Sequence, residues 1–203
     1  MFTLFFNRLL RNFRGWALTF AVMSLPACDA HLPQSNLPQM TFRHLPAIAL
    51  RVVDIQLVNK ANPGTNPPHV VHLMPVSPVK ALTRWAEDRL QIAGNNNTAR
   101  FTILESDVTE TALKVDKTVT GLFKKQQSER YDAIIEASLE IFDRRGIRKA
   151  VVSSRATRSV TMPEDTSIND RRRLWYEMME KIMAEFNSEM DRNIGRYMTE
   201  YRF

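Results

Sequence analysis

A thirteen-residue segment, Arg130–Phe142, constrains the fold more than any other part of the chain. Its residues alternate between two faces, with a period of two, which is the period of a β-strand. The sequence therefore predicts a long strand with one buried face. The residues on that face are Tyr131, Ala133, Ile135, Ala137, Leu139 and Ile141.

The residues that follow predict a hairpin partner for this strand. Asp143–Gly146 is a short turn in which Gly146 is available for a positive φ. The returning strand is expected from Ile147 to about Met162, and Pro163 stops it. Its inward face should carry Ala150, Val152, Ser154 and Ala156.

Two further strands are predicted earlier in the chain. Ile48–Val58 is dense in β-branched residues and apolar on both faces in its later part, which favours a central strand. The other covers about Ala99–Leu113, and the polar segment Lys114–Ser128 predicts a hairpin connection. The loop Asn59–Ser77 contains four prolines and is long enough to be functional, with His69–Leu73 as a minor edge strand.

Two helices are predicted from caps and apolar spacing. Ser77 caps the first, Pro78 opens it, and Gly94 is its expected stop. The second should run over Ile168–Tyr201 after a capping box at Ser167–Asp170. At about 50 Å it would extend past a four-stranded sheet or meet a partner. Its methionines suit either an adaptable binding surface or a core, and their helical spacing favours the core: Met178, Met179, Met183, Met190 and Met198.

The predicted order is β-α-β-β-β-α. This order favours an α+β fold, a two-layer sandwich in which a mixed four-stranded sheet carries two helices on one face. The sandwich is expected as a single domain over residues 41–203. Residues 28–40 contain two prolines and little apolar content, so they are expected to form a flexible tether.

The amino-terminal residues Met1–Ala27 have the order of a secretory signal. Three arginines and no acidic residue come first, followed by the apolar run Trp16–Leu25. That run is about half of the roughly 20 residues that a spanning helix needs. Cys28 follows, and because it is the only cysteine, no intrachain disulfide can form.

The sequence Leu25-Pro26-Ala27-Cys28 resembles the lipobox of bacterial lipoproteins, although Pro26 departs from the usual pattern. The resemblance implies cleavage after Ala27, a diacylglycerol on the thiol of Cys28 and an acyl chain such as palmitate on the new amino terminus. Two alternatives remain: ordinary cleavage that leaves a free thiol, and an uncleaved amino-terminal anchor.

The element order behind a lipidated cysteine resembles two groups of Gram-negative envelope proteins. One is the ABC-type transport auxiliary lipoproteins, and the other is the lipopolysaccharide-assembly lipoprotein. The resemblance implies a non-enzymatic accessory component of a lipid transport or envelope assembly complex, facing the periplasm. Asp29 resembles an inner-membrane retention signal, so the cell membrane and the outer membrane both remain open. The partner complex and the oligomeric state are not implied.

The net charge of the chain says little about its partners, but one run of arginines is informative. Three of the 28 basic residues lie in Met1–Ala27, which leaves 25 against 22 acidic residues, too small an excess to indicate nucleic acid. The run Arg171, Arg172, Arg173 falls at the start of a helix, where the macrodipole disfavours cations. It predicts contact with anionic lipid or an acidic partner. The alternative is a solvated helix end with pairs such as Arg173–Glu177.

The sequence contains no recognised catalytic motif, and no cofactor is expected. His69 and His72 follow two prolines, so an extended segment would direct their rings to opposite faces, which argues against a shared metal. The protein is therefore expected not to be an enzyme. The alternative is a lipid-anchored periplasmic hydrolase or metal-dependent enzyme with its site in Asn59–Ser77.

Overall fold

The central sheet has four strands in the order β2-β4-β5-β6. The computed structural model describes residues 37–114 and 127–203. β2 (Asp54–Asn59) runs parallel to β4 (Thr98–Ala112), and β5 (Gln127–Phe142) and β6 (Arg148–Pro163) continue antiparallel.

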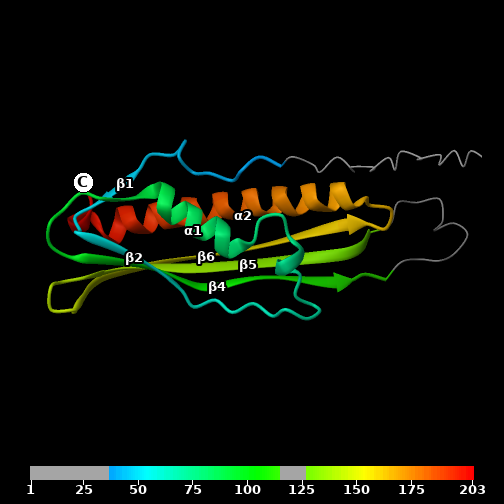
Figure 1. Ribbon diagram of the computed structural model, residues 1–203, viewed down its shortest axis with the longest axis horizontal. Helices are drawn as coiled ribbons and strands as arrows, with labels where there is room; N and C mark the ends of the chain where they lie inside the picture. Colours follow the sequence, from blue (N-terminus) through cyan, green and yellow to red (C-terminus); the bar gives the residue numbers. More distant parts are fainter. Residues whose placement is uncertain (1–36, 115–126) are drawn as a thin grey trace, which may run out of the picture. The chain divides into compact units, whose positions relative to one another are not determined.

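Both long helices, α1 (Pro78–Arg89) and α2 (Ile168–Tyr197), lie on the same face of this sheet (Figure 1). α1 packs on β4, and α2 packs on β6 and β5. The predicted α+β two-layer sandwich with a mixed four-stranded sheet is therefore confirmed.

The hairpin of β5 and β6 follows its predicted pattern. The inward residues of β5 are at most 3 % exposed, and Val152, Ser154 and Ala156 of β6 are buried as well. Gly146 has a φ of 79°, the left-handed conformation expected of it in the turn. The predicted connection Lys114–Ser128 lies largely outside the described residues.

The predicted single strand Ile48–Val58 is wrong, because the chain bends at Arg51–Val53. β1 (Ile48–Leu50) pairs in parallel with β3 (Leu90–Ile92) in a separate two-stranded sheet. The amide of Val52 bonds the carbonyl of Leu50 at 2.8 Å, which turns the chain before β2 begins. β2 is consequently an edge strand rather than a central one.

The first helix begins as predicted but ends earlier. The hydroxyl of Ser77 accepts a hydrogen bond from the amide of Lys80, and Pro78 occupies the first turn. The predicted stop at Gly94 is wrong, since the helix ends at Arg89 and β3 follows directly. Gly94 instead lies against the bend, where a Cβ would be 2.5 Å from the carbonyl carbon of Arg51.

The segment His69–Leu73 is not a strand. His69 forms a single antiparallel bridge to Thr109, and Val71–Leu73 forms a short 3₁₀ helix, η1. The amide of Val70 donates to the carbonyl of Val108 at 2.9 Å. This segment therefore covers the edge of β4 beyond the point where β2 ends.

α2 does not extend past the sheet, so the predicted overhang is wrong, and the alternative of contact with a partner stays a prediction. It ends at Tyr197, and a short 3₁₀ helix, η3 (Thr199–Tyr201), turns the chain back so that the amide of Phe203 bonds the carbonyl of Ala49 at 3.0 Å. Strands of 16 residues are about 53 Å long and a helix of 30 residues about 45 Å, so the two run side by side (Figure 1). The five methionines of the apolar stripe are at most 2 % exposed, which confirms their place in the core.

The chain enters the domain along α1 and α2. Met40 and Phe42 are buried, so the last residue of the predicted tether lies on the domain. The side chain of Asp88 holds this segment by accepting hydrogen bonds from the amide of Phe42 and the hydroxyl of Thr41, both at 2.8 Å. None of the helices in residues 37–114 and 127–203 has the length and apolar character needed to cross a membrane.

Candidate functional site

The predicted functional residues fall into two groups. The processing residues Leu25 and Ala27, the lipidation residue Cys28 and the sorting residue Asp29 lie outside the described residues. The arginine run Arg171–Arg173 lies in the first turns of α2.

Ser167 caps the amino terminus of α2 as predicted, but the carboxylate of Asp170 bonds the Ser167 hydroxyl, and no bond to the Ser167 amide completes the predicted capping box among the described residues. The hydroxyl of Ser167 accepts a hydrogen bond from the amide of Asp170 at 3.1 Å and donates to the Asp170 carboxylate at 2.6 Å. The carboxylate also places a negative charge in the first turn, where the helix dipole favours it. The arginines thus follow directly after an acidic residue in the first turn.

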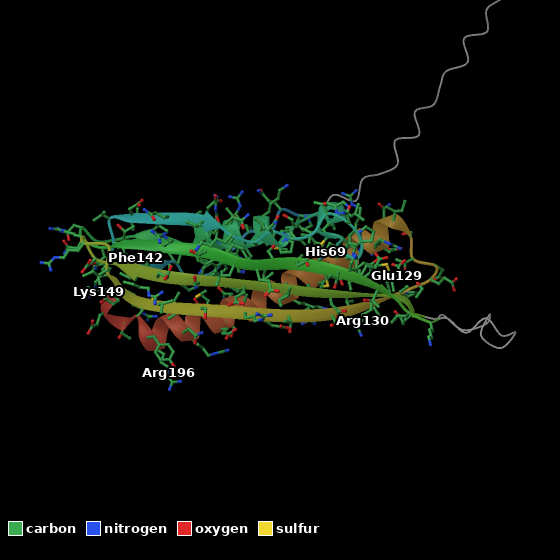
Figure 2. All side chains as sticks on the ribbon, turned by 90° about the horizontal axis from the view of Figure 1, so that it is seen from below. His69, Glu129, Arg130, Phe142, Lys149 and Arg196 are labelled. Carbon is green, nitrogen blue, oxygen red and sulfur yellow. The ribbon has the colours of Figure 1, made fainter. Side chains whose placement is uncertain are left out.

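Arg171 is a structural residue. Its Nη2 lies 3.0 Å from Glu129 Oε1, and its Nη1 donates to the hydroxyl of Tyr131 at 3.1 Å. The Tyr131 hydroxyl in turn donates to Glu129 Oε2 at 2.6 Å. The three side chains form a closed triangle that joins α2 to the start of β5. Figure 2 shows Glu129 at the opposite end of the sheet from Phe142.

Tyr131 is the buried member of this triangle. It is fully shielded from solvent, and its ring meets Trp175 edge-on at a centroid distance of 5.4 Å. Burial, followed by the hydrogen bond to Glu129, raises the pKa of Tyr131 well above its ordinary value, and the charge of Arg171 only partly opposes this. The phenol therefore stays protonated and acts as a donor to Glu129 at physiological pH.

Arg172 and Arg173 differ from Arg171. Arg173 is exposed, and its Nη1 lies 3.8 Å from the carboxylate of Asp170 rather than pairing with Glu177. Arg172 is half-buried, and its buried Nε has no hydrogen-bond acceptor among the described residues. Of the three cations, Arg172 is the one without an ion-pair partner in the described part of the chain, so the run presents less free charge than its sequence indicates.

A second polar network joins α1 to the other half of α2. The indole of Trp85 donates to Asn187 Oδ1 at 2.8 Å, and the Asn187 amide donates to Asp191 Oδ2 at 3.3 Å. Arg89 Nη2 donates to Asp191 Oδ1 at 2.5 Å. Sequence analysis missed this network because each helix–helix contact joins residues 102 positions apart, and helical periodicity marks a buried face without identifying its partner.

The loop Asn59–Ser77 contributes His69 to a histidine–carboxylate pair with Asp107 of β4. His69 Nδ1 lies 2.6 Å from Asp107 Oδ2, and Asp107 Oδ1 also accepts the amide of Val108 at 2.8 Å. His72 lies on η1 and is exposed. Within residues 37–114 and 127–203, no group of three or more histidine, cysteine, aspartate or glutamate side chains is placed to hold a metal ion.

A groove of about 440 Å³ lies between the entering segment and α2. Met40 and Phe42 form one wall, and Tyr176 and Met183 form the other. Burial, and then the charge of Glu180, raises the pKa of Tyr176. The lining of the groove is mostly apolar, so the groove offers a surface for packing rather than a set of reactive groups.

Comparisons with known proteins find similar solved structures, and two of them illustrate the likeness to this chain. No family model matches the sequence, and no curated protein matches it. A minor lipoprotein from Acinetobacter baumannii is 13 % identical with a TM-score of 0.37, over 73 % of this chain and 96 % of that one. A Xanthomonas campestris protein described under DUF330 is 9 % identical with a TM-score of 0.27, over 71 % and 87 %. At these scores the likeness carries no functional argument.

Proposed function

We propose that this protein is a lipid-anchored, non-enzymatic lipoprotein of a Gram-negative envelope that assists a lipid transport or envelope assembly complex. The observation that carries the proposal is the sequence Leu25-Pro26-Ala27-Cys28 at the end of a short apolar run. A diacylglycerol on Cys28, together with an amino-terminal acyl chain such as palmitate, would supply more than the two signals that stable anchoring requires.

The sandwich suits a role in contacts rather than in chemistry. Its polar networks tie α2 to β5 and to α1, and the partners of Arg171 and Arg89 lie within the domain. Arg172 and Arg173 are the members of the predicted contact that remain available for anionic lipid head groups or an acidic partner. Asp29 leaves the inner membrane and the outer membrane as alternative destinations for the anchored protein.

One observation favours the alternative, a lipid-anchored periplasmic hydrolase or metal-dependent enzyme. His69 is oriented by Asp107 in the way that a general base is oriented by a carboxylate. Such a dyad needs a nucleophile or a metal, and among the described residues no hydroxyl or thiol is hydrogen-bonded to His69. Metal analysis of the purified protein separates the two functions, since a stoichiometric bound metal would support the enzyme.

The anchor is tested by changing Cys28→Ser in the full chain. We expect the variant to lose labelling by palmitate and to move from the membrane fraction to the soluble periplasmic fraction or to accumulate as precursor. The matched control is Ser24→Ala, which leaves the thiol in place. Labelling and membrane association that persist without the thiol would refute the lipobox interpretation.

The accessory role is tested by capture of the lipidated protein from solubilised membranes. We expect an envelope transport or assembly complex to be recovered with the wild type and to be reduced when both Arg172 and Arg173 are replaced by glutamine. Replacement of both Arg144 and Arg145 by glutamine, in the exposed turn at the opposite end of the sheet, is the matched charge control. Recovery of no envelope complex would count against the accessory role without affecting the anchor.

A further inference from the structure

The carboxyl end of the chain encloses a small cavity whose wall contains two arginines. The cavity has a volume of about 230 Å³ and lies between the segment Pro46–Ala49, the end of α1, the last turns of α2 and the end of the chain. Its charged wall residues are Arg89, Asp191 and Arg202. Figure 1 shows the carboxyl terminus next to β1, which bounds the cavity.

Arg89 is buried in an unusual way for a cation. Its side chain is 3 % exposed, and only Nη2 is paired, with Asp191. Nε and Nη1 are shielded from solvent, and neither has a hydrogen-bond acceptor in residues 37–114 or 127–203. A guanidinium carries five N–H donors, and buried donors without acceptors are costly, so this arrangement calls for an acceptor that the described residues do not provide.

Arg89 and Asp191, which are paired through Nη2 of Arg89, both line this cavity. Arg202 supplies a second cation from the end of the chain. A Cβ on Gly195 would lie 3.5 Å from Arg202 Nη1, which places this guanidinium over the last turns of α2. Arg202 has no ion-pair partner among the described residues, so the side chains of the wall carry two positive charges and the one negative charge of Asp191.

We propose that this cavity binds an oxyanion, a phosphate or carboxylate group, between Arg89 and Arg202. Two guanidinium groups present planar pairs of donors that match such a group, and charge-assisted bonds of this kind are stronger than neutral ones. The apolar wall residues Ile48 and Ile194 strengthen the attraction by excluding water. The anion is either a free small molecule or the phosphate of a lipid head group. The proposal is independent of the anchor at Cys28.

Thermal unfolding of the full chain in nonionic detergent tests the site with inorganic phosphate as the probe. Phosphate should raise the midpoint of unfolding at constant ionic strength, because a ligand bound only by the folded state stabilises it. In Arg202→Gln, the apparent affinity for phosphate should fall by about tenfold or more, the effect of losing one charged hydrogen-bond donor. Arg89→Met should abolish the response. Arg196→Gln is the matched control, since Arg196 is exposed on α2 and points away from the sheet (Figure 2).

A second arm distinguishes the source of the anion. Mixed micelles with and without phosphatidylglycerol replace phosphate in the same measurement. Stabilisation by phosphatidylglycerol that Arg202→Gln weakens assigns the site to a lipid head group, whereas a response to phosphate alone assigns it to a free oxyanion, and both support the proposal. No response to either probe, or an equal response in the wild type and Arg202→Gln, overturns it. If Arg89→Met does not fold, Arg202→Gln decides the test.

Discussion

The two ends of α2 bury arginines in contrasting ways. Near the amino end, Arg171 contacts Glu129 and Tyr131, and its side chain is still 32 % exposed. Near the carboxyl end, Arg89 is 3 % exposed and has Asp191 as its one ion-pair partner among the described residues. The more deeply buried cation thus has the fewer acceptors. A run of charges in the sequence therefore does not identify the arginine with unsatisfied donors. The run Arg171–Arg173 contains a structural residue, whereas the isolated Arg89 has buried N–H groups without acceptors among the described residues.

The largest effect should come from removing the partner of the deeply buried cation. Asp191→Ala leaves Arg89 without a counter-charge, and we expect the free energy of unfolding to fall by about 3 kcal/mol, the low end for such pairs because Asp191 is 40 % exposed. Arg89→Met should cost less, about 1 kcal/mol, because it removes the unpaired donors together with the charge. Urea unfolding measures both losses. Equal losses would contradict the expected cost of leaving Arg89 buried without a counter-charge.

Removing the counter-charge of Arg171, in its triangle with Glu129 and Tyr131, should destabilise the fold less than Asp191→Ala does. Glu129→Gln keeps an acceptor for Tyr131 and leaves Arg171 partly solvated, so we expect a loss of about 1.5 kcal/mol by urea unfolding. Glu140→Gln on the same strand, where Glu140 pairs with the exposed Arg148, is the control and should cost less. A loss for Glu129→Gln as large as that for Asp191→Ala would contradict the comparison.

Asp88 precedes Arg89 in α1, and its carboxylate is fully partnered. Its contribution to the stability of the fold should therefore depend on pH. Burial raises the pKa of Asp88, but hydrogen bonds from Phe42, Thr41 and Arg43 outweigh it and hold the pKa below its usual value. The resulting stability is present above the unfolded-state value of about 3.9 and is lost as pH falls through the folded value.

We expect Asp88→Asn to lower the free energy of unfolding by about 1 kcal/mol at neutral pH, the size of one hydrogen bond. It should also flatten the loss of stability in acid, which urea unfolding at a series of pH values measures. An unchanged acid limb would show that this carboxylate does not hold the entering segment.

The smallest effect is expected at the exposed end of the arginine run. Arg173 and Asp170 are 61 % and 59 % exposed at 3.8 Å, so Arg173→Gln should change stability by less than about 0.5 kcal/mol. Binding to micelles that contain phosphatidylglycerol should nevertheless weaken, and added salt should reduce the difference. A stability loss as large as that of Glu129→Gln would make Arg173 structural, like Arg171.

Elements with a strong local signal were predictable. The alternation of Arg130–Phe142 specified β5 because a period of two has no helical counterpart over thirteen residues. Ser77 and Ser167 specified the helix starts because capping is a local hydrogen bond. Ile48–Val58 was mispredicted because its β-branched residues include Val52 and Val53 in the bend itself. The bend depends on contacts with Asn97 and the carboxyl end of the chain.

The candidate sites also differ in how far the sequence alone reveals them. The run Arg171–Arg173 was visible in the sequence, but its division into one structural and two available cations depends on Glu129 and on the cap. Arg89 gave no signal at all, since an arginine at a helix end is normally solvated. Its burial follows from the packing of α1 against α2 and β3.

Periodicity, caps and the lone Cys28 were therefore determined by the sequence itself, because each is a property of residues close together in the chain. The positions of β2 at the sheet edge, of the carboxyl end beside β1 and of Arg89 beside Asp191 were decided only by the tertiary structure. The physical reason is that these contacts join residues about a hundred or more positions apart, or depend on which strand pairs with which. Packing selects them, and no local pattern encodes them.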